Sequence, residues 1–283
     1  MSIDSTWLRC PNCFADLSAV DERVYGCDHG HRFDRSKHGF LTLLPPKAPR
    51  TIGDDRAMLS DRAALLGSGA YRPIADVLAD AVGAAAVSSA SAEPRVADLG
   101  CGTGYYAAHI AARVPQAHVL LADRSPDAVR AALRSTPDAT GVVLDLWRPL
   151  PLRDVSADVI LNVFAPRNPS EFARILRPHG RLMVVVPRVD HLRELRDEGA
   201  LLEVPAEKTT TVTQQLSTAG FVRRRSETVE YSLHADDTTR AQLIGMGPTA
   251  RHATSHTDHD SPPAREVTVA VDVMAFVHSD GAR

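Results

Sequence analysis

A glycine-rich turn between a predicted strand and a predicted helix constrains the fold of this chain most. Val96-Ala97-Asp98-Leu99 is a short apolar run typical of a buried strand, and glycines follow at positions 100, 102 and 104 before a helical pattern begins at Tyr105. Because glycine lacks a side chain and adopts positive φ, such a turn lets a ligand approach the backbone closely. A dinucleotide-binding turn has a third glycine that packs the helix on the sheet, and Tyr105 and Ala107 stand where it is needed.

From residue 95 onward, strand and helix patterns alternate, which predicts a mostly parallel seven-stranded sheet with crossover helices. We expect the last strand to run antiparallel. The predicted strands are 95–99, 118–122, 141–144, 157–164, 181–186, 221–230 and 266–276. The predicted helices begin near residues 55, 71, 105, 126, 170 and 213, and residues 83–94 are expected to form a surface loop.

Acidic residues mark the carboxyl ends of the first three strands. The order Asp98-x-Gly100-x-Gly102-x-Gly104, followed by Asp123 and Asp145, resembles the binding loop of class I S-adenosylmethionine methyltransferases. Ligands of open parallel sheets bind outside these strand ends, so the loop and both later acids should converge there.

Each group of residues in this predicted site is expected to contact a different part of the cofactor. The methionine tail and sulfonium would lie against the backbone of residues 100–104, which includes Thr103, with Tyr105 opening the helix. Asp123 is placed to accept the ribose hydroxyls, and Asp145 with Leu146 lies by the adenine edge. Asp98 would orient the loop or meet the amino group. Each aspartate has the alternative of acting only as a cap or turn residue.

The acceptor is expected beside the end of the fourth strand. In Asn162-Val163-Phe164-Ala165-Pro166-Arg167, Asn162 could orient the edge of a nucleobase and Phe164 could stack on it. The alternative is a core strand that ends in an ordinary turn. Cys101 is only a small residue of the glycine loop in this interpretation.

A separate pattern near the N-terminus predicts a metal site. Cys10 and Cys13 are followed by Cys27 and His31, which supplies three thiolates and an imidazole, a common set for structural zinc. His29 is the alternative fourth ligand. The few apolar residues between the two pairs are too few for a core, so metal binding should supply the folding energy. Four protein ligands leave zinc without an open position for chemistry.

Charge and composition set limits on the partners. The formal net charge of −3 gives no global attraction to nucleic acid, so RNA would have to meet local basic segments such as residues 32–38 and 223–225. Such segments are also common as solvated surface. No apolar run approaches the length of a membrane span, and the N-terminal residues lack the features of a signal peptide, so we expect a cytoplasmic protein.

The domain organisation follows from these segments. Residues 1–45 are expected to form the zinc ribbon, 46–70 a linker and helix, and 71–283 the S-adenosylmethionine-binding domain. Residues 45–50 form a proline-rich connector. His252, His256 and His259 lie in a Thr-, Ser-, Asp- and Pro-rich stretch that we interpret as a loop rather than a metal site.

With both halves considered, the chain resembles the 23S rRNA (guanine-N1)-methyltransferases of the RlmA type from end to end. The marks are Cys10-Pro11-x-Cys13, Cys27-x3-His31-Arg32-Phe33-Asp34, Lys37-x-Gly39-Phe40, Arg62, Gly69-x-Tyr71-x-Pro73, Asp98 to Tyr106 and Ala165-Pro166. A zinc ribbon ahead of this glycine loop is more diagnostic than either part alone.

The resemblance implies methylation of N1 of a single guanine in a domain II hairpin loop of 23S rRNA, with S-adenosylmethionine and one structural zinc. It also implies a homodimer, places Tyr71 with the cofactor residues, and favours the nucleotide 748 type, whose members include tylosin-resistance enzymes, over the 745 type. The chain departs from the family at Met246-Gly247-Pro248-Thr249-Ala250-Arg251, where relatives carry aromatic residues. That departure puts base stacking by this segment in doubt.

Two other functions fit the same residues. One is methylation of a small molecule with the zinc unit as a lid, and the other is a zinc-dependent RNA-binding protein that only senses the cofactor. The basic segments favour RNA over a small substrate, and the intact Asp98 and Asp123 argue against a degenerate cofactor site.

Overall fold

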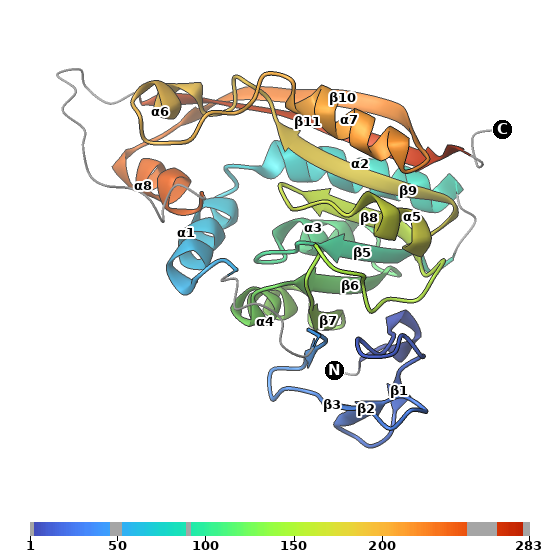
Figure 1. Ribbon diagram of the computed structural model, residues 1–283. Helices are drawn as coiled ribbons and strands as arrows, with labels where there is room; N and C mark the ends of the chain where they lie inside the picture. The colour runs from blue at the N-terminus through green and yellow to red at the C-terminus, as the bar shows by residue number, and fades with distance from the viewer. Residues whose placement is uncertain (1–2, 46–52, 89–91, 248–264, 280–283) are drawn as a thin grey trace.

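An eight-stranded sheet runs through the molecule (Figure 1). The computed structural model describes residues 3–45, 53–88, 92–247 and 265–279, without the side chains of 85–88. The strand order is β10-β11-β9-β8-β5-β6-β7-β4, and β11 runs antiparallel to both of its neighbours. The strands are β4 (Leu41–Thr42), β5 (Arg95–Leu99), β6 (His118–Asp123), β7 (Thr140–Val143), β8 (Ala157–Val163), β9 (Leu176–Pro187), β10 (Phe221–His234) and β11 (Glu266–His278).

The predicted mostly parallel sheet is confirmed, and β4 adds an eighth strand to the seven expected. Leu41 and Thr42, which fall within the predicted ribbon segment of residues 1–45, pair in parallel with Val142 and Val143 of β7 and close one edge of the main sheet. Every residue of β8 is buried, as expected of a central parallel strand covered on both faces.

Helices cover both faces of the sheet, and the buried side chains form an apolar core on each side. Helices α2 (Arg72–Ser88) and α3 (Tyr105–Arg113) pack on one face, while α5 (Pro169–Ile175) and α7 (Lys208–Thr218) pack on the other. Helix α4 (Pro126–Ser135) begins as predicted, because the Ser125 side chain accepts the Ala128 N–H and Pro126 occupies the first turn.

The structure corrects the sequence-based elements in several places, including the start of α7 at Lys208 rather than near 213 and of β9 at Leu176 rather than 181. The expected loop over 83–94 is wrong in its first part, because α2 continues to Ser88 through an alanine-rich stretch of high helix propensity. Helices α6 (Arg193–Asp197) and α8 (Asp237–Gly245) were not predicted. Helix α1 (Arg56–Gly67) was predicted, and it packs against α8 at one end of the sheet (Figure 1).

The N-terminal unit is a small antiparallel sheet with a short 3-10 helix, and it packs on the main body (Figure 1). Its elements are η1 (Ser5–Trp7), β1 (Ser18–Ala19), β2 (Val24–Gly26) and β3 (Arg32–Asp34). Trp7, Leu8, Leu17 and Tyr25 are buried in the same apolar cluster as residues of β5 and β6. The expectation that this unit has too few apolar residues for a core therefore holds only for the unit alone, because it shares a core with the larger domain.

Polar contacts fix the unit to the loop that precedes β8. Leu8 forms an antiparallel bridge with Leu152, and the Arg9 N–H donates to the Pro151 carbonyl at 2.9 Å. The Arg9 guanidinium pairs with Asp154 at 3.0 Å, and Asp154 also pairs with Arg174 of α5. Backbone pairing and ion pairs together set the orientation of the unit against the sheet.

Replacement of Trp7 should show how much this packing contributes to stability. Trp7 is 1% exposed, and the guanidinium carbon of Arg95 lies 3.9 Å from the centroid of its ring. Trp7→Ala should lower the free energy of unfolding by about 3–5 kcal/mol in urea titrations, because a large cavity replaces the ring. Trp147→Ala is the matched control, since Trp147 is 71% exposed and its loss should cost less than about 0.5 kcal/mol. Equal effects of the two changes would contradict the shared core.

Within the part of the chain that the structure describes, no helix is long and apolar enough to cross a membrane. Several sequence-based expectations lie outside the described residues: the proline-rich connector after Pro45, the three histidines at 252, 256 and 259, and the family departure beyond Gly247.

Candidate active site

A pocket of about 840 Å³ opens at the carboxyl ends of the parallel strands. The segments that follow β5, β6, β7 and β8 line it, together with residues of α1, α8 and the connection from β9 to α7. The volume lies in the range of cofactor and ligand sites. The expected convergence of Asp98, Asp123 and Asp145 on one site is observed, since all three line this pocket.

The glycine loop lies against the turn after β8. Gly100 has φ +92°, and a Cβ at this position would lie 2.4 Å from the Cβ of Ala165. Gly104 starts α3 with φ +78°, and a Cβ there would lie 2.7 Å from the Cα of Ala132 in α4. Both glycines are therefore required by close packing as well as by backbone conformation.

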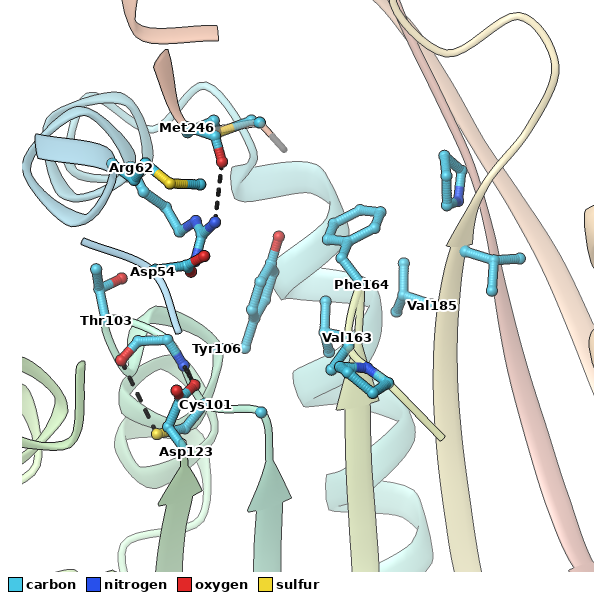
Figure 2. Close-up of a pocket in the computed structure, with 18 of the residues that line it drawn as sticks. Asp54, Arg62, Cys101, Thr103, Tyr106, Asp123, Val163, Phe164, Val185 and Met246 are labelled. Carbon is cyan, nitrogen blue, oxygen red and sulfur yellow. Dashed lines mark hydrogen bonds and ion pairs between the residues drawn. The ribbon is translucent and has the colours of Figure 1, made fainter. Parts of the chain in front are cut away.

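Asp123 supports the loop through its carboxylate. Its Oδ2 accepts the Gly102 N–H at 3.0 Å (Figure 2), and its Oδ1 accepts the Ser125 N–H at 2.9 Å. Burial raises the pKa of Asp123, and the two backbone donors oppose that shift. Each carboxylate oxygen keeps a lone pair for a further donor such as a hydroxyl group.

Asp98 is a buried carboxyl group that faces the pocket. It is 2% exposed, and burial, reinforced by the negative charge of Asp123, raises its pKa to about 7. Tyr105 and Tyr106 also line the pocket, and their hydroxyl groups are buried without a hydrogen-bond partner among the described residues. A cationic ligand fits the pocket beside Asp98, because it would stabilise the buried carboxylate.

Asp145 and Leu146 line the pocket beyond Asp123. The Asp145 carboxylate pairs with Arg124 and accepts the Trp147 N–H at 3.1 Å. The Trp147 side chain, which the sequence analysis did not single out, lies exposed at the rim.

Asn162 joins the two halves of the site from beneath. Its side chain is fully buried, and its Nδ2 donates to the Leu99 carbonyl at 3.2 Å and to the Pro166 carbonyl at 2.8 Å. Asn162 is not among the residues that line the pocket, so the structure does not place its side chain in contact with a substrate bound there. Its amide group holds the end of β5 to the turn after β8.

Phe164 stands at the end of β8 and is 41% exposed into the pocket (Figure 2). Its φ of +52° is unusual for a bulky residue and indicates a backbone held by its surroundings. The ring lies 6.3 Å from that of Tyr71 and 6.1 Å from that of His191, with an interplanar angle of 24° to the imidazole. Phe164, Tyr71 and His191 thus form an aromatic cluster in the pocket wall.

His191 was missed in the sequence analysis, because it lies in an irregular segment after β9 with no motif around it. Its Nδ1 accepts the Ala270 N–H at 3.2 Å, so the proton of the neutral ring is on Nε2, which lies 3.3 Å from the Tyr71 hydroxyl oxygen. Burial, together with the positive charges of Arg196 and Lys208, lowers the pKa of His191 to about 4. The neutral imidazole therefore donates to Tyr71 and fixes the phenol in the pocket wall.

Arg62, a mark of the family resemblance without an assigned role, links three segments over the glycine loop. It pairs with Asp54 and donates through Nη2 to the Met246 carbonyl at 2.9 Å (Figure 2). A Cβ at Gly102 would lie 3.3 Å from Arg62 Nη1. Helices α1 and α8 are thereby held together over the glycine loop.

The predicted metal ligands form one cluster at the N-terminal unit. The ligand atoms of Cys10, Cys13, Cys27 and His31 all lie within 4.8 Å of one another, and His29 is not in this group. Cys13 Sγ lies 3.6 Å from Cys27 Sγ, and His31 Nδ1 lies 3.5 Å from Cys10 Sγ and 3.4 Å from Cys27 Sγ. Tetrahedral zinc requires separations of roughly 3.5 Å between sulfur and nitrogen ligands and roughly 3.8 Å between two sulfurs, so the four residues fit the metal.

Comparisons with known proteins agree with both halves of the molecule. Residues 96–180 match the family described as "Methyltransferase domain", and residues 8–51 match the family described as "RlmA, N-terminal". The fold and site define a class I S-adenosylmethionine-dependent methyltransferase with an N-terminal zinc ribbon. The methyltransferase domain implies S-adenosylmethionine as its cofactor, and the cluster of three cysteines and one histidine suggests a structural zinc. The chain belongs to the 23S rRNA (guanine-N1)-methyltransferase family.

The family membership rests on relatives that match most of the chain. The 23S rRNA (guanine(748)-N(1))-methyltransferase of Streptomyces fradiae is 42% identical over 87% of this chain and 86% of its own length. A protein of Micromonospora griseorubida named as a putative 23S rRNA (guanine-N(1)-)-methyltransferase is 39% identical over 87% of both chains. YxjB of Bacillus subtilis, named in the same way, is 30% identical over 69% of both.

Proposed function

We propose that the protein transfers a methyl group from S-adenosylmethionine to N1 of one guanine in a domain II hairpin loop of 23S rRNA, of the nucleotide 748 type. The observation that carries this proposal is the fusion of the ribbon to the methyltransferase domain in one chain that is similar over 87% of its length to the enzyme of Streptomyces fradiae. We take the acceptor of this chain from the name of that relative.

The donor end of the pocket is proposed to hold the cofactor. Its methionine part would lie against Gly100, Gly102, Thr103 and Gly104, near Asp98, Tyr71 and Tyr105, with Asp123 on the ribose and Asp145 and Leu146 by the adenine. When bound, S-adenosylmethionine supplies an electrophilic methyl group on its sulfonium. Asp98 and Asp123 favour that cation electrostatically, and Tyr71 is held in place by His191.

The acceptor end is proposed to begin at Phe164. A guanine stacked on this exposed ring would face the glycine loop, because Gly100 lies against Ala165 of the same turn. Asn162 is proposed as a positioning residue that fixes this turn relative to the cofactor loop through its two carbonyl contacts. Transfer to N1 is an in-line displacement, so the main task of the site is to position donor and acceptor.

The zinc ribbon of residues 1–45 is proposed to help bind the RNA, with Cys10, Cys13, Cys27 and His31 as its zinc ligands. Residues 46–70 are proposed to form the linker and first helix, and residues 71–283 the methyltransferase domain. Exposed Arg32, Lys37 and His38 support RNA contact by the ribbon. We further propose, from the family resemblance, a homodimer that acts in the cytoplasm and protects ribosomes against macrolides of the tylosin kind.

Cofactor affinity should depend on pH through Asp98. The pKa of Asp98 is about 7, so below pH 7 the carboxyl group is neutral and must lose its proton before it can pair with the cationic cofactor. The affinity for S-adenosylmethionine should therefore rise from pH 6 to pH 8 in calorimetric titrations, and Asp98→Asn should bind about tenfold more weakly at pH 8 with a flat profile between these values. An unchanged pH profile in the variant would remove Asp98 from cofactor binding.

The proposed reaction is tested with tritiated S-adenosylmethionine and unmodified 23S rRNA. Purified protein should label one guanine in domain II, and reverse transcription should stop beside it, because a methyl group on N1 blocks Watson–Crick pairing. Label found only in small metabolites, or no label in RNA, would reject the proposal. An equal label in free domain II RNA and in assembled subunits would define naked RNA as a sufficient substrate.

A further inference from the structure

Arg167 and Lys208 are basic residues that line the pocket from the segments after β8 and β9. Arg167 lies between β8 and α5, and Lys208 is the first residue of α7. Arg167 Nη1 donates to the Ala165 carbonyl at 3.2 Å, which ties the guanidinium group to the same turn as Phe164. Arg167 Nε is buried, and it has no hydrogen-bond partner among the described residues.

Neither cation has an acidic partner in the part of the chain that the structure describes. Glu203, which also lines the pocket, pairs with Arg196 at 3.6 Å. Burial and the positive charge of Arg167 lower the pKa of Lys208, and Lys208 in turn contributes to the low pKa of His191. Two like charges are thus held in one pocket wall without compensation, an arrangement that an anionic ligand would stabilise.

The sheet topology separates these cations from the acids of the site. Asp98, Asp123 and Asp145 belong to β5 or lie at the ends of β6 and β7, whereas Arg167 follows β8 and Lys208 follows β9. In the strand order, β8 and β9 lie on one side of β5, and β6 and β7 lie on the other. The acidic end suits the cationic donor, and the basic end lies beside the proposed acceptor ring.

We propose that Arg167 and Lys208 bind a phosphodiester group of the RNA next to the target guanosine. This inference rests on the proposed function and adds a phosphate subsite to it. A guanine stacked on Phe164 carries its ribose and flanking phosphates toward the pocket wall, where a fixed guanidinium and an ammonium group are suited to an anionic oxygen. The contact would hold the nucleotide in register and carry no sequence information.

The test compares Lys208→Gln and Arg167→Gln with the wild type on a domain II transcript. Each variant should raise the KM for RNA about tenfold and reduce the slope of log affinity against log salt concentration by about one, while the affinity for S-adenosylhomocysteine stays within twofold. Lys208→Arg should restore most of the RNA affinity. Arg113→Gln is the control for charge alone, because Arg113 is exposed at the distal end of α3 and pairs with Asp80 of α2.

A second experiment identifies the phosphate that the two cations bind. Two transcripts carry an uncharged methylphosphonate, one on each side of the target guanosine. For the wild type, one of the two transcripts should be a weaker substrate. With that transcript, Lys208→Gln should not raise the KM for RNA any further. Unchanged RNA kinetics in both variants, or additive losses at both positions, would overturn the inference. A loss of S-adenosylhomocysteine affinity instead would assign the cations to the cofactor carboxylate. If the wild type methylates no RNA at all, the proposed function itself fails.

Discussion

Gly100→Ala should weaken the binding of S-adenosylhomocysteine by at least about 100-fold, which corresponds to about 2.7 kcal/mol. The added Cβ would lie 2.4 Å from the Cβ of Ala165, and the φ of +92° is unfavourable for alanine. The loop and the turn after β8 must move apart, and both the cofactor and the acceptor contacts move with them. Calorimetric titration of the folded variant measures the loss.

Gly83→Ala provides the matched control for this substitution. Gly83 lies inside α2, where a Cβ meets no heavy atom within 4 Å, so the change should preserve cofactor affinity and increase stability by about 0.5–1 kcal/mol. Wild-type affinity in Gly100→Ala would mean that the ligand does not depend on the packing of this loop.

Cys13→Ser should abolish zinc binding and lower RNA methylation by at least about 100-fold, with the affinity for S-adenosylhomocysteine within about threefold of the wild type. Cys13 supplies one of four ligand atoms that lie within 4.8 Å of one another, and a zinc site with three remaining ligands loses most of its folding energy. The cofactor pocket is built from other segments of the chain, so its binding energy should persist. Metal analysis, methylation assays and calorimetry measure the three quantities.

His29→Ala is the control for this experiment, because His29 is exposed next to the cluster without belonging to it. It should retain one zinc ion per chain and full activity. Normal RNA methylation by zinc-free Cys13→Ser would contradict the role that we assign to the ribbon. Because Cys10 and Cys27 are buried in the core shared with the larger domain, the melting temperature of Cys13→Ser should also fall.

The parts of the fold that local sequence determines were predictable. The glycine turn after β5, the Ser125-Pro126 start of α4 and the Cys10-to-His31 spacing each depend on a few adjacent residues, and each lies in the structure where the sequence analysis placed it. The mostly parallel sheet follows from runs of apolar residues that are buried on both faces.

The features that depend on distant contacts were not predictable in the same way. Strand β4 has only two residues, and its place in the sheet depends on pairing with β7 about a hundred positions later. His191 enters the site because the Ala270 N–H and the Tyr71 hydroxyl group orient its ring. Asn162 was placed at the right strand end, but the sequence could not tell that carbonyls of Leu99 and Pro166 occupy its amide.

The arrangement of charges in the pocket also depends on distant contacts and was not predictable from the sequence. Arg167 and Lys208 are 41 positions apart in the sequence and come together only because β8 and β9 are neighbours in the sheet. In the sequence each is a single basic residue in a polar segment, which is most often solvated surface. The separation of acidic and basic ends is therefore a property of the strand order.

The central claim is that the carboxyl ends of β5 and β6 form a pocket for the methyl donor. Calorimetric titration of the purified protein with S-adenosylhomocysteine tests this claim most directly. We expect saturable heat with one site per chain, and its loss in Gly100→Ala. A titration without heat above dilution, for both the donor and its demethylated product at several temperatures, would contradict the account.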